Sequence, residues 1–293
     1  MSFRIPFVAF AGALALALPV HAATDWAAVG RALGKAGALQ PGGVYRVGMP
    51  RSDLKVTLDG VSIKPALALG SWLAFRDMGD QAEVMGDLVL LQGEVNPVIS
   101  ALEAGGVQVT ALHNHLLRSS PATMYMHVDG RGDAVRLAAT LHAALARTRT
   151  PLGAGPPAKP EPIGLDTASL DRVIGAAGKP AGGVWQYSIA RAEPVRAAGM
   201  TVPGAMGSAI GINFQSLGGG KAAATGDFVL TADEVNPVIR ALRANKIEVT
   251  AIHNHMLDEE PRLFFLHFWG KGDAEALAQG LKAALHEVKV AGR

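Results

Sequence analysis

The residues best suited to chemistry are histidines that occur twice in the same short motif. The motif reads Thr-Ala-Leu-His-Asn-His in its first copy and Thr-Ala-Ile-His-Asn-His in its second. In a β-strand, side chains at positions i and i+2 lie on one face, so His113 and His115 are predicted to point the same way. The second motif places His253 and His255 alike. Two adjacent imidazoles are a poor choice for an apolar core, so each pair is a candidate functional site.

A third histidine follows each pair on the next predicted strand. If the intervening connection is a hairpin centred near Ser120, His127 lies directly opposite His113, and His267 lies opposite His253. Directly opposed residues have Cβ atoms about 4.5–5.5 Å apart. Three histidines so placed can bind Zn²⁺ or another divalent metal with a fourth position open. The predicted metal ligands are His113, His115, His127, His253, His255 and His267, and a slip of one residue in the register would separate them.

Acidic side chains shared by both copies are few. Glu94 and Glu234 precede a predicted helix, and the other shared pairs are Asp87 with Asp227 and Asp133 with Asp273. We predict Glu94 and Glu234 as the catalytic pair, either as a general base beside metal-bound water or as a fourth ligand. A carboxylate at a helix N-terminus is also favourable on electrostatic grounds alone.

Three functions are compatible with these residues. The first is a divalent-metal-binding protein or metal-dependent hydrolase. The second is a non-catalytic ligand-binding or scaffold module in which the histidines form hydrogen bonds. The third is a pH-responsive protein that titrates through its clustered imidazoles. The chain has no P-loop, no Gly-x-Ser-x-Gly elbow and no dinucleotide-binding glycine motif, so no organic cofactor is expected.

The elements that position the histidines belong to an internal repeat. Gly86 aligns with Gly226, an offset of 140 residues, and the alignment continues without a gap to Leu145 and Leu285. A duplicated unit of this length predicts two similar domains about a pseudo-twofold axis.

Each copy predicts an α+β domain with a β-α-β-β-α core. In the first copy, strands are expected at 87–91, 107–116 and 123–128, with helices at 98–104 and 134–146. Asn96 and Asp133 are the predicted helix caps. Further strands are expected at 43–47 and 54–63. The natural packing is an antiparallel sheet with both helices on one face.

Four segments follow from these patterns. Residues 1–22 read as a signal peptide, with Arg4 before an apolar run and a small-residue cleavage site. The first repeat spans 23–147, a proline- and glycine-rich linker spans 148–164, and the second repeat spans 165–293.

Composition limits the cellular compartment and the kinds of partner that we expect for this protein. The chain has no cysteine, which excludes disulfides, thiolate metal sites and an N-terminal lipid anchor. Its net charge of +2 argues against a nucleic-acid partner. We expect a periplasmic or secreted protein with no stable membrane anchor after signal cleavage, whose partner is a small molecule or an envelope component.

The second copy carries the most recognisable run of motifs, from Gly226-Asp-Phe-Val-Leu through Thr-Ala-Ile-His-Asn-His-Met to Leu-His-Phe-Trp-Gly-Lys-Gly-Asp273. Over both copies the chain resembles the LppY/LpqO family of exported bacterial proteins, a domain of unknown function. The resemblance implies export but no established reaction, so it assigns no catalytic residue. The mycobacterial namesakes are described as probable lipoproteins, and this chain departs from them in having no cysteine to carry a lipid.

Overall fold

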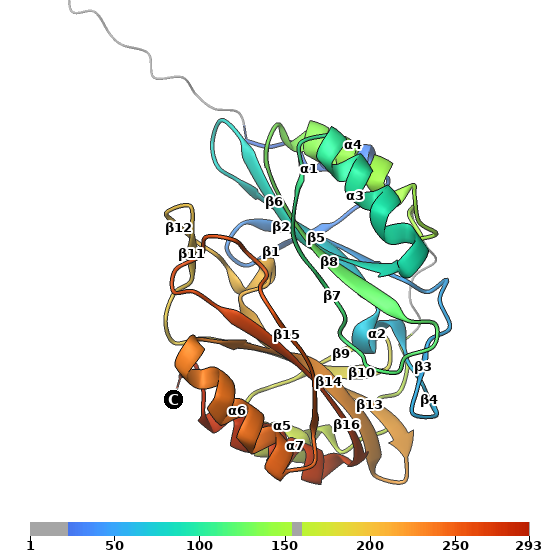
Figure 1. The fold of residues 1–293 in the computed structure, drawn as a ribbon, viewed down its shortest axis with the longest axis vertical. Coiled ribbons are helices and arrows are strands. Elements are labelled where there is room, and N and C mark those ends of the chain that lie inside the picture. Colours follow the sequence, from blue (N-terminus) through green and yellow to red (C-terminus); the bar gives the residue numbers. More distant parts are fainter. Residues whose placement is uncertain (1–22, 154–159, 293) are drawn as a thin grey trace, which may run out of the picture.

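The structure, a computed structural model, describes residues 23–153 and 160–292 (Figure 1). The predicted signal peptide, 1–22, lies outside the described residues, as does part of the predicted linker. The remaining linker residues, 148–153 and 160–164, form neither helix nor strand. None of the described helices is long and apolar enough to cross a membrane.

The first repeat is a six-stranded antiparallel sheet with the order β1-β2-β5-β6-β8-β7. Its elements are α1 (Trp26–Leu33), β1 (Ala38–Gln40), β2 (Val44–Pro50), β3 (Thr57–Leu58), β4 (Val61–Ser62), α2 (Pro65–Ala68), β5 (Gly70–Asp77), β6 (Ala82–Leu91), η1 (Gln92–Glu94), α3 (Val95–Ala104), β7 (Gln108–His113), β8 (Thr123–Gly132) and α4 (Ala134–Leu145).

The second repeat builds the same sheet, with the order β15-β16-β14-β13-β10-β9. Its elements are α5 (Thr167–Ile174), β9 (Lys179–Ala181), β10 (Val184–Ala190), β11 (Arg196–Ala197), β12 (Met200–Thr201), η2 (Gly204–Met206), β13 (Ala209–Gly218), β14 (Lys221–Leu230), α6 (Ala232–Ala244), β15 (Glu248–His253), β16 (Phe264–Asp273) and α7 (Ala274–His286). The predicted α+β class with two tandem antiparallel domains is confirmed.

Several elements differ from the prediction. Strand β5 and helix α1 were not predicted, and the expected strand at 54–63 is only the small β3–β4 hairpin outside the main sheet. The predicted cap at Asn96 is wrong, because α3 already begins at Val95. In the second repeat α6 begins at Ala232, since the Glu234 carboxylate accepts the Thr231 N–H at 2.8 Å and closes a capping box. The Asp133 cap is confirmed by its bond to the N–H of Arg136.

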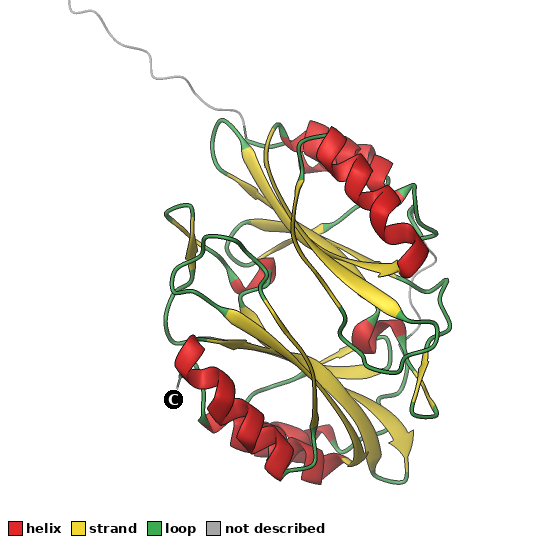
Figure 2. Cartoon of the chain, viewed as in Figure 1, coloured by secondary structure: helices red, strands yellow, loops and turns green. Residues whose placement is uncertain are grey.

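The longer helices, α3 and α4 in the first repeat and α6 and α7 in the second, cover the outer face of each sheet (Figure 2). In the first repeat Val29 of α1, Leu102 of α3 and Leu141 of α4 pack with Phe75 of β5 in one buried core. The amphipathic helices therefore bury one face of each sheet, and the opposite face must be covered by other parts of the chain.

The two inner faces cover each other. One buried apolar cluster joins Leu67 and Val89 of the first repeat to Val184 and Trp269 of the second. Connecting segments are exchanged as well: α2 lies against β13 and β14, whereas η2 lies against β2 and β5. The pseudo-twofold axis therefore runs through the interface, and whatever the inner faces carry is brought together there.

Candidate metal centre

The two histidine motifs meet at this axis. Strands β7 and β15, which end at His113 and His253, lie side by side (Figure 1). The Thr110 hydroxyl donates to the carbonyl oxygen of His255 at 2.6 Å, and the Thr250 hydroxyl donates to that of His115 at 2.6 Å. These reciprocal bonds fix the two motifs against each other across the repeats.

The strand register differs from the predicted one. The connection is centred on Ser119 rather than Ser120, so His127 pairs with Ala111 and His113 pairs with Tyr125, while a β-bulge between Val109 and Ala111 lies beyond these pairs. The prediction that His127 directly opposes His113 is therefore wrong by two positions. Because side chains alternate with a period of two, this shift keeps His127 on the same sheet face as His113, with ring centroids 5.1 Å apart.

All six predicted histidines lie in one cluster. Each close pair joins one repeat to the other, with ring centroids 3.4 Å apart for His113 and His253, 3.6 Å for His115 and His267, and 3.7 Å for His127 and His255. The sequence predicted one patch per repeat, whereas the structure forms a single shared centre, hereafter the histidine centre.

Two aspartates complete this centre, and they were not among the predicted site residues. Asp87 is the strand partner of His127, and Asp227 is that of His267. Carboxylate oxygens of Asp227 lie 3.4 Å from Nε2 of His255 and 3.8 Å from Nε2 of His267. An oxygen of Asp87 lies 3.8 Å from Nε2 of His115. Their presence in both copies was the available signal, but the pairing of β6 with β8 was needed to place them.

The carboxylates predicted as catalytic lie elsewhere. Glu94 binds the buried Arg51 at 2.8 Å, and Glu234 binds the buried Arg191 at 2.6 Å. Both also accept a backbone N–H at the start of the following helix. The structure does not bring either into the histidine centre, and it engages both in ion pairs and caps.

Burial sets the charge state of the histidines. It lowers the pKa of His253 to about 4, and burial together with the neighbouring imidazoles holds the pKa of His115 and His127 well below the usual range. The pKa of His255 and His267 is lowered in the same way. The imidazoles are therefore neutral at physiological pH, which is the form that donates a lone pair to a metal.

The aspartates respond in the opposite direction. Burial raises the pKa of Asp87 to about 8, although the charge of Arg46 partly offsets it. Burial likewise raises the pKa of Asp227, and the charge of Asp87 adds to the effect. Two carboxylates in such a site need a cation to remain ionised near neutral pH.

Several ring nitrogens are oriented for coordination. Nδ1 of His267 lies 2.8 Å from the carbonyl oxygen of Gly226, so it carries the proton and leaves the lone pair on Nε2. A backbone carbonyl that fixes the tautomer in this way is typical of metal-binding histidines.

Buried atoms of the centre lack partners. The atoms without a hydrogen-bond partner among the described residues are Oδ1 of Asp87 and Asp227, Nδ1 of His113, and Nε2 of His127, His253, His255 and His267. An unpaired buried polar group costs about 1–3 kcal/mol, and such groups are rare in folded proteins. Seven of them in one place form a donor set suited to a metal ion.

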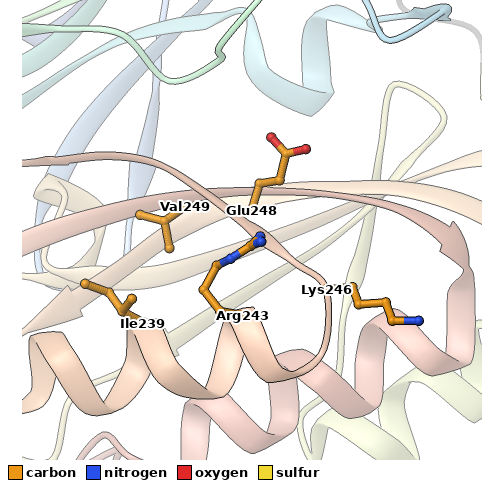
Figure 3. A pocket seen from close by; sticks show the side chains of 5 residues that line it. All are labelled: Ile239, Arg243, Lys246, Glu248 and Val249. Atoms are coloured by element: carbon orange, nitrogen blue, oxygen red, sulfur yellow. The ribbon is translucent and has the colours of Figure 1, made fainter.

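Two hollows on the protein surface lie outside the centre. One, of about 470 Å³, is lined by Arg243, Lys246 and Glu248 beside β15 (Figure 3). The other, of about 330 Å³, lies between the repeats and is lined by residues that include Asp129 and Asp258. Burial and the charge of Glu83 raise the pKa of Asp129 to about 6.

Fold and site together define a duplicated α+β protein with a histidine and aspartate centre at its pseudo-twofold axis. The sequence profile described as "Domain of Unknown Function (DUF1259)" matches residues 27–147 and again 168–287. The chain belongs to this family, in two tandem copies. No curated protein matches the chain.

Solved structures give only distant matches. A double-ringed trimeric shell protein of the RMM microcompartment, MSM0271, is 12% identical with a TM-score of 0.21, over 73% of this chain and 85% of that one. The trimeric microcompartment shell protein PduB is 13% identical with a TM-score of 0.21, over 86% and 90%. Crystal form I of TP0453 is 14% identical with a TM-score of 0.20, over 90% and 99%. Likenesses this low carry no information on function.

Proposed function

We propose that this protein binds a divalent transition metal at the histidine centre. The observation that carries the proposal is the convergence of seven buried, unpartnered nitrogen and oxygen atoms from both repeats. Neutral imidazoles with a minority of carboxylates suit Zn²⁺ or a similar transition-metal ion rather than Mg²⁺ or Ca²⁺, which prefer all-oxygen ligands.

The narrower form of the proposal is a metal-dependent hydrolase. A metal held here with one coordination position open lowers the pKa of bound water and supplies a hydroxide nucleophile near neutral pH. The open position is expected on the side of Asp227, because its side chain is 19% exposed and that of Asp87 only 8%. Glu94 and Glu234 have no part in this form of the proposal.

The proposal also includes the cellular setting. An apolar run after Arg4 and a small-residue cleavage site support export to the periplasm or the exterior, with no lipid anchor because the chain has no cysteine. The motif resemblance supports placement within the LppY/LpqO group.

A second candidate is a non-catalytic ligand-binding module. The hollow between the repeats, lined by Asp129, Arg131 and Asp258, favours it. In that case the histidines would form hydrogen bonds to a ligand, and the protein would fold and bind without metal.

The test is the metal content of the mature, untagged protein purified from its native compartment, measured by mass spectrometry. A His113→Ala/His253→Ala variant is measured in parallel, with His286→Ala as the control because His286 is exposed and outside the centre. Near-stoichiometric metal in the wild type and the control, with little in a folded double variant, supports the proposal. Equally low metal in all three favours the ligand-binding module.

A further inference from the structure

We infer that the histidine centre holds two metal ions, bridged by Asp87 and Asp227, with each ion bound by histidines from both repeats. This inference rests on the proposed function and specifies its stoichiometry and ligand arrangement. Each position combines histidines of both repeats, although Asp87, His115 and His127 of the first repeat also lie within 4.8 Å of one another.

The number of donor atoms is the first argument. Seven unpartnered atoms converge, and His115, whose Nε2 lies 3.0 Å from Nε2 of His113, brings the set to eight side chains that can each offer one ligand atom. A zinc ion in a protein usually takes four ligands. One ion would leave several of these buried atoms unpaired, at about 1–3 kcal/mol each. Two ions account for the set.

The pseudo-twofold axis is the second argument. Ligand atoms of His113, His115, His253 and His267 all lie within 4.8 Å of one another. The 140-residue offset maps this group onto His253, His255, His113 and His127. A second observed group, His127 with His253 and His255, consists of members of that image. Because the first group is not its own image, the axis generates two positions rather than one.

Each position therefore joins the repeats. His115 and His267 define the first position, and their rings lie 3.6 Å apart. His127 and His255 define the second, with rings 3.7 Å apart. His113 and His253 lie between the two positions, where either can complete a coordination shell.

The carboxylates are placed to bridge. The two oxygens of Asp227 point to different positions, since Oδ2 lies 3.4 Å from His255 and Oδ1 lies 3.8 Å from His267. One oxygen of Asp87 and ligand nitrogens of His115 and His127 all lie within 4.8 Å of one another, so Asp87 lies where the two positions adjoin. Bridged ions in two-metal sites are about 3.5–4 Å apart and can share an oxygen ligand such as hydroxide or an oxyanion.

The experiment is a metal titration. Protein stripped with a chelator is titrated with Zn²⁺, and bound equivalents are measured by calorimetry and mass spectrometry. The wild type and His286→Ala are expected to bind two equivalents per chain. His127→Ala/His255→Ala, which removes the histidines of one position, is expected to bind one.

The outcomes separate this inference from the proposed function. One equivalent in the wild type overturns the two-ion centre but leaves the proposed function standing, whereas none contradicts both. Loss of both equivalents in a folded His127→Ala/His255→Ala variant overturns the assignment of those residues to one position. If that variant does not fold, Co²⁺-substituted wild type decides: coupled ions reduce its electron paramagnetic resonance signal relative to two isolated ions, and an unreduced signal contradicts bridging.

Discussion

The two repeats supply matching ligands to the histidine centre, but they shield it from solvent to different extents. The strand partner of Asp87 is Trp72, whereas the equivalent partner of Asp227 is Gly211. The Trp72 ring is covered by the Arg46 guanidinium at 4.1 Å and approaches Gly207 of the other repeat. At Gly211 an added Cβ would meet nothing within 4 Å among the described residues. Both repeats therefore retain the metal-ligating side chains. The centre is more open to solvent on the side of the second repeat.

A second difference concerns the rings behind the histidines. Tyr125 stacks on His115 at 3.4 Å, and Phe265 stacks on His255 at 3.3 Å. Only Tyr125 has a hydroxyl, which donates to the carbonyl oxygen of Ala68. The ring behind the first motif is thus anchored by a hydrogen bond within its own repeat, whereas Phe265 has no polar group and contributes packing alone.

The largest expected effect comes from metal removal, because both repeats contribute ligands and the ions connect them. At a metal concentration 1,000-fold above Kd, binding stabilises the folded state by about 4 kcal/mol for each independent site. A chelator is therefore expected to lower the free energy of unfolding by at least this amount, measured by urea denaturation. The His113→Ala/His253→Ala variant serves as the control and should respond little. An equal response of the two proteins would contradict a stabilising role for the centre.

The next effect compares the buried ion pairs of the two repeats. Arg51 retains Asp53 at 2.9 Å when Glu94 is replaced, whereas Arg191 retains only Glu193 at 3.8 Å when Glu234 is replaced. Breaking a buried pair costs about 3–5 kcal/mol. We expect Glu234→Gln to destabilise by roughly 3 kcal/mol and Glu94→Gln by less, with metal content unchanged in both. Loss of metal from a folded Glu94→Gln or Glu234→Gln variant would contradict this assignment and would indicate that the glutamates bind the metal.

The pH dependence of the chelator-treated protein is the third prediction. The histidine pKa values lie below that of the unfolded chain, about 6.5, so stability is lost as pH falls below 6.5. The pKa of Asp87 is raised to about 8, so its contribution is lost as pH rises from about 4 toward 8. Stability should therefore be highest near pH 6.5, with a steeper acid side because six histidines outnumber two aspartates.

Denaturation of the stripped protein across pH 4–9 checks this profile. Each histidine contributes up to about 1.4 kcal/mol per pH unit on the acid side. His267→Gln should therefore flatten that side, and a variant with an unchanged slope would contradict the neutral, buried state of His267.

The smallest effect tests the unequal closure directly. Gly211→Trp places on the second repeat the side chain that covers Asp87 in the first, and it should slow metal removal by a chelator several-fold without changing stoichiometry. Trp72→Ala should accelerate removal. Stopped-flow measurement with a chromogenic chelator gives both rates, and equal rates in wild type and Gly211→Trp would rule out access beside Gly211.

Part of this architecture was predictable from sequence. Local sequence patterns were enough to identify the 140-residue repeat, the α+β class, the Asp133 cap and the six histidines, because these features do not depend on long-range contacts. Strand β5 was not predicted, although the segments on either side of it were identified. Asn96 was wrongly predicted as the helix cap, because the helix begins before it, as the capping box of Glu234 shows in the second repeat. The histidine set survived a wrong register only because the error was two residues, which preserves the sheet face.

The parts that were not predictable depend on long-range packing. Asp87 becomes a site residue only through the pairing of β6 with β8, and the merging of the two histidine patches depends on how the inner sheet faces pack. No local pattern reports that His115 of one repeat stacks on His267 of the other. Glu94 was predicted as catalytic because its carboxylate could act as a base. In the structure it forms an ion pair with the buried Arg51, a long-range contact that no sequence pattern indicated.

The most direct test of the shared centre is anomalous X-ray scattering from crystals of the natively purified protein, recorded on both sides of the zinc absorption edge. We expect two anomalous peaks about 3.5–4 Å apart, one on either side of the pseudo-twofold axis, between Asp87 and Asp227 and contacted by histidines of both repeats. Separate peaks confined to one repeat each, or ordered water in place of any peak, would contradict it.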